Sequence, residues 1–202
     1  MKKGKQTMNL TPTIKLASKL FAALVLSTQI TACLPVVVGG AAAGGAMAAD
    51  RRTSGVYVED QNIKLKASHS LDDVVTDLSH VNVTSYKGNV LITGEVPDAE
   101  TKTKVENAIK VIESVRNVTN ELTIGPKSSL SSRADDSYLT TKIKAQFVSE
   151  NKFQANYVKV VTENSVVYLM GYVTHAEADA AAEIARNTSG VTKVVKVFEY
   201  MP

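Results

Sequence analysis

The sequence has few of the residues from which enzyme sites are built. It contains one cysteine and three histidines, and His69, His80 and His175 have no metal-ligand spacing to one another. The motifs of zinc proteases, P-loop proteins, serine hydrolases and dinucleotide-binding enzymes are all missing. We therefore expect a protein without a catalytic site, a metal or a cofactor.

Acidic residues are missing from the first 32 positions, which carry five lysines and end in an apolar run at 20–32. A basic start, a short apolar centre and a small final residue are typical of a secretory signal, here residues 1–32, which begins at Met1 or Met8. The run is too short and too interrupted to span a bilayer. Loss of the signal lowers the net charge from +3 to about −2. The positive charge therefore belongs to the signal, and we expect no nucleic acid partner.

The single cysteine, Cys33, directly follows this signal and has no partner for a disulfide. Its position between a signal and a glycine-rich segment does not suit a catalytic thiol, which needs a positioned base and a shaped pocket. The tetrapeptide Ile-Thr-Ala-Cys at 30–33 resembles the cleavage box of bacterial lipoproteins. The alternative is an ordinary signal followed by a chance cysteine.

The resemblance to lipoproteins implies cleavage before Cys33, a diacylglycerol on its sulfur and an acyl chain such as palmitate on its new amine. Each buried CH₂ contributes roughly 0.8 kcal/mol, so two or three chains anchor a protein stably. The next residue is Leu34 rather than aspartate, which in Gram-negative lipoproteins generally implies delivery to the outer membrane. We therefore expect a lipid-anchored protein of the outer membrane that faces the periplasm.

Residues 33–59 join this anchor to the rest of the chain. The segment is rich in glycine and alanine and shows neither helical nor strand periodicity. This composition predicts a flexible tether. A short segment lying on the membrane is the alternative, because residues 36–38 are three consecutive valines.

The remainder of the chain contains one pattern twice. A strand-like run ends at Gly94 in the first copy and at Gly171 in the second, 77 positions later. Upstream, Asp60 matches Asp136 with an offset of 76. A nearly fixed offset over about 65 residues indicates an internal duplication.

Each copy is predicted to run helix, strand, strand, helix, strand. In the first copy, residues 60–125, the expected ranges are 60–73, 81–86, 90–94, 98–113 and 118–124. In the second copy, residues 135–202, they are 136–148, 157–162, 166–171, 176–188 and 193–200. The expected hairpin turns are at Gly88-Asn89 and Glu163-Asn164, and a polar linker at 126–134 joins the copies.

The order of elements predicts the fold of each copy. The second helix makes a crossover between the last two strands, so those strands should run parallel, whereas the hairpin pairs antiparallel. We expect an α+β fold: two αββαβ domains, each with two helices packed on a three-stranded mixed sheet. Domains this small are marginally stable alone, and pairing them would bury more surface.

The duplicated strand-glycine-x-valine-helix pattern resembles the BON domain. The resemblance is most specific at residues 140–146, 161–174 and 182–191, and it extends over about 60–202. It is close to outer-membrane lipoproteins of Gram-negative bacteria that carry two such domains. The resemblance implies phospholipid binding and a role in envelope integrity at the division site, and it brings no catalytic motif.

The second copy is the better candidate for lipid binding. Its net charge is −1 against −3 for the first copy, so it repels anionic lipid less. In its first helix Leu139, Ile143 and Phe147 form the expected buried stripe. The predicted lipid-binding residues lie on a neighbouring stripe: Tyr138, Thr141, Lys142 and Ala145.

An exposed aromatic ring beside a lysine suits the headgroup region of a membrane. The first copy has Asn62 and Lys66 at the equivalent positions and lacks the aromatic ring. The expected ligand is therefore an anionic phospholipid such as phosphatidylglycerol, bound by Tyr138 and Lys142. Alternatively, Tyr138 packs against the rest of the protein and Lys142 is an ordinary solvated lysine.

Two other functions stay open at this point. One is an adaptor that binds a protein of the envelope-assembly machinery without recognising lipid directly. The other is an envelope enzyme, for which the fold would have to form a deep polar pocket with perturbed titrating groups. Lipid binding differs from both because it should depend on headgroup charge and weaken steeply with salt.

Overall fold

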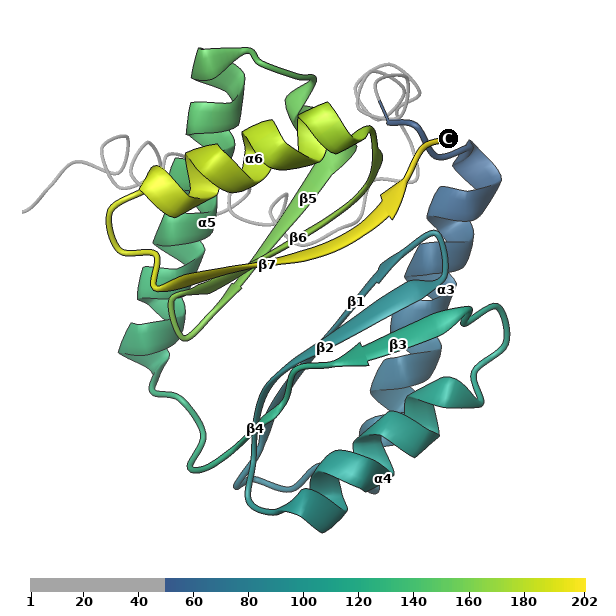
Figure 1. Ribbon diagram of the computed structural model, residues 1–202. Coiled ribbons are helices and arrows are strands. Elements are labelled where there is room, and N and C mark those ends of the chain that lie inside the picture. The colour runs from purple at the N-terminus through teal and green to yellow at the C-terminus, as the bar shows by residue number, and fades with distance from the viewer. Residues whose placement is uncertain (1–49) are drawn as a thin grey trace, which may run out of the picture. The chain divides into compact units, whose positions relative to one another are not determined.

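The computed structural model describes residues 50–202, which form two domains of the same architecture (Figure 1). In each domain two helices cover one face of a mixed sheet. The predicted α+β fold with two αββαβ domains is confirmed. The signal at 1–32, Cys33 and most of the predicted tether lie outside the described residues.

Domain 1 contains two helices and four strands. Its elements are α3 (Ser54–Leu71), β1 (His80–Tyr86), β2 (Asn89–Val96), α4 (Ala99–Lys110), β3 (Asn117–Asn120) and β4 (Thr123–Ile124). Strand β2 lies in the middle of the sheet, because it pairs antiparallel with β1 and parallel with both β3 and β4. The crossover through α4 imposes this parallel pairing, as predicted.

Domain 2 repeats the arrangement with three strands. Its elements are α5 (Leu130–Glu150), the short 3₁₀ helix η2 (Ala155–Tyr157), β5 (Val158–Glu163), β6 (Val166–Val173), α6 (His175–Asn187) and β7 (Lys193–Tyr200). Strand β6 is central, antiparallel to β5 and parallel to β7. Helix α6 begins with a capping box, in which Thr174 and Glu177 each bond the other's backbone N–H.

The first helix of each domain begins earlier than the sequence pattern predicts. Helix α3 starts six residues before position 60, and α5 starts six residues before position 136. Thr53 and Ser129 are the N-caps, since each side chain accepts a hydrogen bond from the backbone N–H three residues later. The extra turns bury no side chain, so hydrophobic periodicity carries no signal for them. Residues 54–59 of the predicted tether are therefore helical, and so are residues 130–134 of the predicted linker.

The last strand of domain 1 is broken where one continuous strand was predicted. Leu122 turns inward and is 2% exposed, and its N–H donates to the side-chain oxygen of Asn120 at 3.2 Å. The N–H of Glu121 still donates to the carbonyl of Ile92 in β2, at 2.9 Å. Burial of Leu122 thus interrupts the ladder, and the sheet has four strands rather than the predicted three.

Both hairpin turns differ by one residue from the predicted positions. Positive φ occurs at Lys87 and Gly88 in domain 1 and at Asn164 and Ser165 in domain 2. The strands set these positions, because β1 extends to Tyr86 and the ladder therefore leaves only two residues for each turn. The backbone N–H groups of both turns donate to a buried aspartate described below.

Each domain has its own hydrophobic core between its helices and its sheet. In domain 2 the predicted stripe is buried, with exposed fractions of 6% for Leu139 and 0% for Ile143 and Phe147. In domain 1, α4 contributes Val105 and Ile109 at helical spacing. The helices cover only one face of each sheet, so the opposite face of each sheet is left for other contacts.

Two negative findings apply to residues 50–202. No helix in this range is both long and apolar enough to cross a bilayer. The same residues contain no cluster of three or more histidine, cysteine, aspartate or glutamate side chains that could hold a metal ion.

Candidate functional site: the outer face of helix α5 and the junction between the domains

The residues predicted to bind lipid lie on one side of helix α5. Tyr138 is 70% exposed, and Thr141 and Ala145 are also exposed. They share a side because residues three, four and seven positions apart follow the helical repeat. Tyr138 is therefore not packed against either domain, and its ring is available at the surface.

Lys142 lies at the edge of this side of the helix and is partly buried. Its ammonium group donates to the backbone carbonyl of Ser189, just after α6, at 3.1 Å. A carbonyl carries no net charge, so this contact positions the lysine without neutralising it. The hydroxyl of Thr141 turns back to the carbonyl of Ser137 in its own helix, at 3.0 Å. Lys142 has no carboxylate partner within 50–202, so among these residues it provides an uncompensated positive charge beside the exposed ring.

Two further exposed apolar residues extend the same side of α5. Leu130 is 79% exposed and Val148 is 68% exposed. Leu130 was not predicted because the sequence pattern places the start of the helix at 136, and Val148 was not predicted although it lies seven positions after Thr141. We call the outer face of α5 the set Leu130, Tyr138, Thr141, Lys142, Ala145 and Val148. One acidic residue, Asp135, is exposed one turn before the ring.

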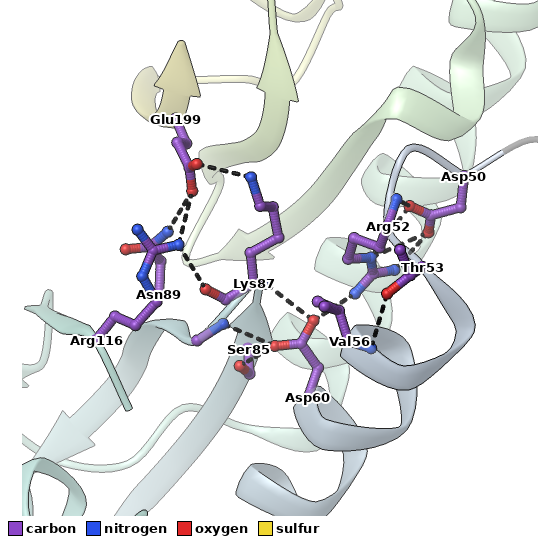
Figure 2. Close-up of polar contacts among 11 residues, drawn as sticks. Asp50, Arg52, Thr53, Val56, Asp60, Ser85, Lys87, Asn89, Arg116 and Glu199 are labelled. Carbon is purple, nitrogen blue, oxygen red and sulfur yellow. Dashed lines mark hydrogen bonds and ion pairs between the residues drawn. The ribbon is translucent and has the colours of Figure 1, made fainter. Parts of the chain in front are cut away.

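The matching aspartates of the duplication lie at the N-terminal part of each first helix and hold the hairpin turn of their own domain. In domain 1 the Asp60 carboxylate is 1% exposed and accepts the N–H groups of Lys87 and Gly88 at 2.9 and 3.0 Å (Figure 2). The hydroxyl of Ser85 and the guanidinium of Arg52 also donate to it, at 2.5 and 2.9 Å. Burial opposes ionisation of Asp60, but these four donors outweigh it and keep its pKa below the ordinary value.

Asp136 has the same role in domain 2. It is 6% exposed and accepts the backbone N–H groups of Asn164 and Ser165 at 2.9 and 2.8 Å. Both residues have positive φ, so the carboxylate satisfies the N–H groups of a tight turn. The aspartates that match in the sequence are thus structural residues that fix the hairpins.

Two consecutive arginines before α3 bind different domains. The guanidinium of Arg51 pairs with Glu177 of domain 2 through two contacts of 2.8 Å and stacks over Tyr157, 3.7 Å from the ring centroid. The guanidinium of Arg52 pairs instead with the Asp60 carboxylate of domain 1. These residues were predicted to belong to a flexible tether, yet they fasten the start of α3 to both domains.

The sheet faces that the helices leave uncovered contact each other. Their apolar centre contains Tyr86 and Leu91 of domain 1 with Tyr168 and Met170 of domain 2, all of them buried. This contact explains why β6 contains six consecutive residues that are mostly apolar, at 166–171, since both faces of that strand are covered.

Polar contacts surround this apolar centre. At one side Glu199 of β7 accepts hydrogen bonds from the side chains of Lys87 at 2.7 Å and Asn89 at 3.2 Å (Figure 2). Arg116 also approaches Glu199, at 3.4 Å. The ammonium group of Lys87 lies over the ring of Tyr172, 3.5 Å from its centroid. The turn that Asp60 holds is thereby also the turn that binds domain 2.

At the end of β5, the buried Glu163 joins the domains. Its carboxylate accepts hydrogen bonds from the side chains of Asn82 at 2.9 Å and Thr93 at 3.2 Å. Burial raises the pKa of Glu163, and the neighbouring Glu95 raises it further, while the bond from Asn82 and the proximity of His80 oppose the shift. All hydrogen-bond partners of this carboxylate among the described residues come from domain 1.

Comparison with known proteins identifies the family. The model of the BON domain family matches residues 59–126 and 135–202. The chain therefore belongs to the BON domain family.

Three relatives are similar to the chain over two thirds of its length or more. It is 39% identical over 196 residues to a Haemophilus influenzae protein named outer membrane lipoprotein DolP, which covers 96% of this chain and 100% of that protein. It is 36% identical over 154 residues to the 21 kDa hemolysin of Actinobacillus pleuropneumoniae, covering 75% and 79%. It is 31% identical over 150 residues to osmotically-inducible protein Y of Escherichia coli, covering 69% and 72%. These relatives are BON-domain proteins rather than members of an enzyme family.

Proposed function

We propose that the protein is a lipoprotein of the outer membrane that faces the periplasm and binds anionic phospholipid through its second BON domain. Its role would be to support envelope integrity, at the division site. The cleavage box at 30–33 and the similarity to a protein named outer membrane lipoprotein support the anchoring, with Cys33 as the acylated residue. Phosphatidylglycerol is the anionic lipid we expect.

The observation that carries the lipid-binding part is the outer face of α5. It presents an exposed tyrosine ring, two exposed aliphatic side chains and a lysine that has no carboxylate partner among the described residues. Aromatic rings settle at headgroup depth in a bilayer, and an ammonium group there meets lipid phosphate. The combination therefore suits docking on an anionic membrane surface.

The contact would be weak and reversible when taken alone. One lysine near an anionic surface contributes roughly 1 kcal/mol, and the apolar side chains add a shallow insertion. Acyl chains on Cys33 would raise the local concentration of the domain at the bilayer, so a weak contact becomes effective. The anchor would thus retain the protein, and the outer face of α5 would select where it stays.

The test is vesicle flotation of the mature chain with Cys33→Ser, so that no acyl chain contributes. Vesicles containing phosphatidylglycerol are compared with purely zwitterionic vesicles at low and moderate salt. We expect flotation only with the anionic vesicles, and less of it as salt increases. Equal flotation with both kinds of vesicle would contradict recognition of headgroup charge.

A matched pair of variants locates the contact. Tyr138→Ala with Lys142→Glu should abolish flotation while leaving the fold intact, because Tyr138 is exposed and Lys142 lies at the edge of the exposed side, outside the core. Asn62→Ala with Lys66→Glu changes the equivalent positions of domain 1 and should have no effect. If both pairs bind vesicles like the parent, the outer face of α5 is not the lipid site.

A protein partner is the second candidate, and an apolar hollow in domain 1 favours it. Leu78 and Ile124 are 66% and 59% exposed, and Leu78 lines a hollow of about 450 Å³ together with Pro97 and Pro126. An adaptor would use such a surface for the envelope-assembly machinery. Cross-linking in envelope extracts should then yield one saturable product that Leu78→Ser removes, whereas vesicle binding would be unchanged by the substitution.

A further inference from the structure

Equivalent positions of the two domains meet at the junction between the sheets. The strand pairing aligns Leu91 with Tyr168, and both lie in the apolar centre. The same alignment makes Asn82 equivalent to Lys159, and Tyr86 equivalent to Glu163. Asn82 bonds Glu163 at one end of the junction, so Lys159 and Tyr86 are the corresponding residues at the other end.

A groove of about 410 Å³ is present at that second end. Lys159 and Tyr86 both line it, together with residues of both domains. Lys159 reaches it because side chains alternate along β5: Val158 and Val160 belong to the core of domain 2, and Lys159 points to the opposite face. Tyr57 of α3 and Lys144 and Val148 of α5 line the groove as well.

The two ends of the junction differ in their hydrogen-bond acceptors. At the first end the carboxylate of Glu163 accepts from Asn82 and Thr93. At the second end the ammonium group of Lys159 has neither a hydrogen bond nor an ion pair with any residue of 50–202. The hydroxyl of Tyr86 is buried, with the residue 2% exposed, and it also has no hydrogen-bond partner in that range. The Asp50 carboxylate also lines the groove, but it is paired with Arg52, so Lys159 and the Tyr86 hydroxyl are donors without an acceptor at this end.

The charges around Lys159 reinforce this imbalance. Burial and the positive charges of Lys64, Arg52 and Lys144 lower the pKa of Lys159 to about 8, and Asp60 only partly opposes them. The Asp60 carboxylate is itself occupied by four donors, as described above. Lys144 and Lys64 form no ion pair with the described residues either. Four cations, Arg52, Lys64, Lys144 and Lys159, outnumber the two carboxylates, Asp50 and Asp60, so the groove has an excess of positive charge that an anion would balance.

The apolar residues of the groove determine what kind of anion fits. Val148 is 68% exposed, and the partly exposed Tyr57 adds apolar surface beside it. A small inorganic anion would leave this surface in contact with water. We propose that the groove binds one anionic amphiphile, whose phosphate or carboxylate meets Lys159, Lys144 and the Tyr86 hydroxyl while its hydrocarbon chain lies along Tyr57 and Val148.

This site differs from the outer face of α5 in its charged residues, although the two share Val148. Lys144 lies on the flank of the helix that faces domain 1, whereas Lys142 lies on the flank that faces α6. The groove takes a single molecule, so it can be tested with a monomeric ligand and without vesicles. Failure of vesicle docking would leave this proposal standing, and failure here would leave vesicle docking standing.

The experiment is isothermal titration calorimetry of the mature chain with Cys33→Ser at pH 7. The probe is decyl phosphate below its critical micelle concentration, with inorganic phosphate and decyltrimethylammonium as comparison ligands. We expect one molecule of decyl phosphate to bind, inorganic phosphate to bind at least tenfold more weakly, and decyltrimethylammonium not to bind. Absence of decyl phosphate binding, or equal binding of the cationic amphiphile, would overturn the proposal. Equal affinity for inorganic phosphate would identify a plain anion site and remove the amphiphile from it.

Substitutions assign the site to the groove. Lys159→Gln should weaken decyl phosphate binding about tenfold or more, because it removes a charge-assisted contact. Tyr86→Phe removes only the hydroxyl and should weaken binding about threefold. Lys104→Gln is the matched control, since it removes an exposed lysine of α4 that pairs with Glu100. Unchanged affinity in a folded Lys159→Gln protein would exclude the groove.

The dependence on pH gives a readout that a structural effect would not produce. Affinity of the parent should fall as pH rises past about 8, where Lys159 loses its proton. Lys159→Gln should lack this fall. The charged and titratable groups that face Lys159 from the packed elements are Asp50, Arg52, Asp60, Lys64, Tyr86 and Lys144. The same fall in both proteins would assign it to one of these groups and contradict the role of Lys159.

Discussion

The first helices of the two domains are alike on their buried sides and different on their exposed sides. Each contributes a buried aspartate to a hairpin turn and an apolar stripe to a core. On the exposed side, Lys66 of α3 is neutralised by Glu113 at 2.9 Å, whereas Lys142 of α5 meets only a neutral carbonyl. Asn62 stands where α5 has Tyr138. The two copies thus share the buried aspartate and the apolar stripe that the fold requires, and they differ in the side chains exposed on the surface.

This difference indicates where function resides. The buried side is constrained by packing and by hydrogen bonds whose loss would destabilise either domain. The exposed side is under no such constraint, so a charge or a ring there can change freely between the copies. An uncompensated lysine beside an exposed ring is therefore a stronger indication of function than any of the matching residues.

The largest expected effect comes from breaking the shared aspartate in each domain. Asp60→Ala leaves two turn N–H groups and the Ser85 hydroxyl without their acceptor and removes one of the two carboxylates that pair with Arg52, which keeps Asp50. It should lower the free energy of unfolding by about 3–4 kcal/mol. Asp136→Ala removes only the two turn bonds and should lose about 2 kcal/mol. Urea denaturation measures both values. Equal losses would mean that the Ser85 and Arg52 contacts of Asp60 contribute nothing to stability.

The matching glycines should give the next largest effect, again unequally. Gly94 has φ of +118°, and a Cβ there would lie 1.9 Å from the His80 carbonyl oxygen. At Gly171 the corresponding distance, to the Tyr157 carbonyl oxygen, is 2.4 Å, and φ lies outside the left-handed region. We expect Gly94→Ala to destabilise by about 2–4 kcal/mol and Gly171→Ala by less. Thermal unfolding followed by circular dichroism would show the order, and the reverse order would contradict it.

A smaller effect concerns Lys159, whose equivalent in domain 1 is the neutral Asn82. The pKa of Lys159 is lowered to about 8, so between about 8 and its unfolded value near 10.4 the folded state binds fewer protons. Stability should therefore rise with pH across that window. Lys159→Gln should be more stable than the parent at pH 7, by roughly 1–2 kcal/mol, and should lose the rise. Urea midpoints from pH 7 to 10 test this, and an identical slope in both proteins would refute it.

The smallest effect would come from giving α3 the surface of α5. Asn62→Tyr with Glu113→Gln supplies a ring and releases Lys66 from its partner. In a chain that already carries Tyr138→Ala and Lys142→Glu, this change should restore part of the binding to anionic vesicles, by roughly 1 kcal/mol or about fivefold. Flotation at low salt is the measurement. No recovery would show that a ring and a lysine are insufficient outside α5.

The sequence was sufficient for the fold because the duplication and the periodicity of its apolar residues are local signals. It was not sufficient for the ends of the first helices, which depend on the polar caps Thr53 and Ser129. The small size of each domain indicated that pairing would bury more surface, but the residues of the junction were not predicted, since neither Arg51 nor Glu163 belongs to a periodic pattern. One signal was present: residues 166–171 are apolar with little alternation, which indicates that both faces of a strand are covered. The exposed ring of Tyr138 was found because it lies beside a recognisable buried stripe.

The attachment of two consecutive arginines to different domains also has a mechanical consequence. A pull on the chain from upstream of residue 50 reaches Arg51 and Arg52 before it reaches helix α3. The Glu177 pair then loads domain 2 at the same moment as the Asp60 pair loads domain 1. Tension is therefore shared by both domains in parallel, so the two domains resist it together instead of being unravelled one after the other.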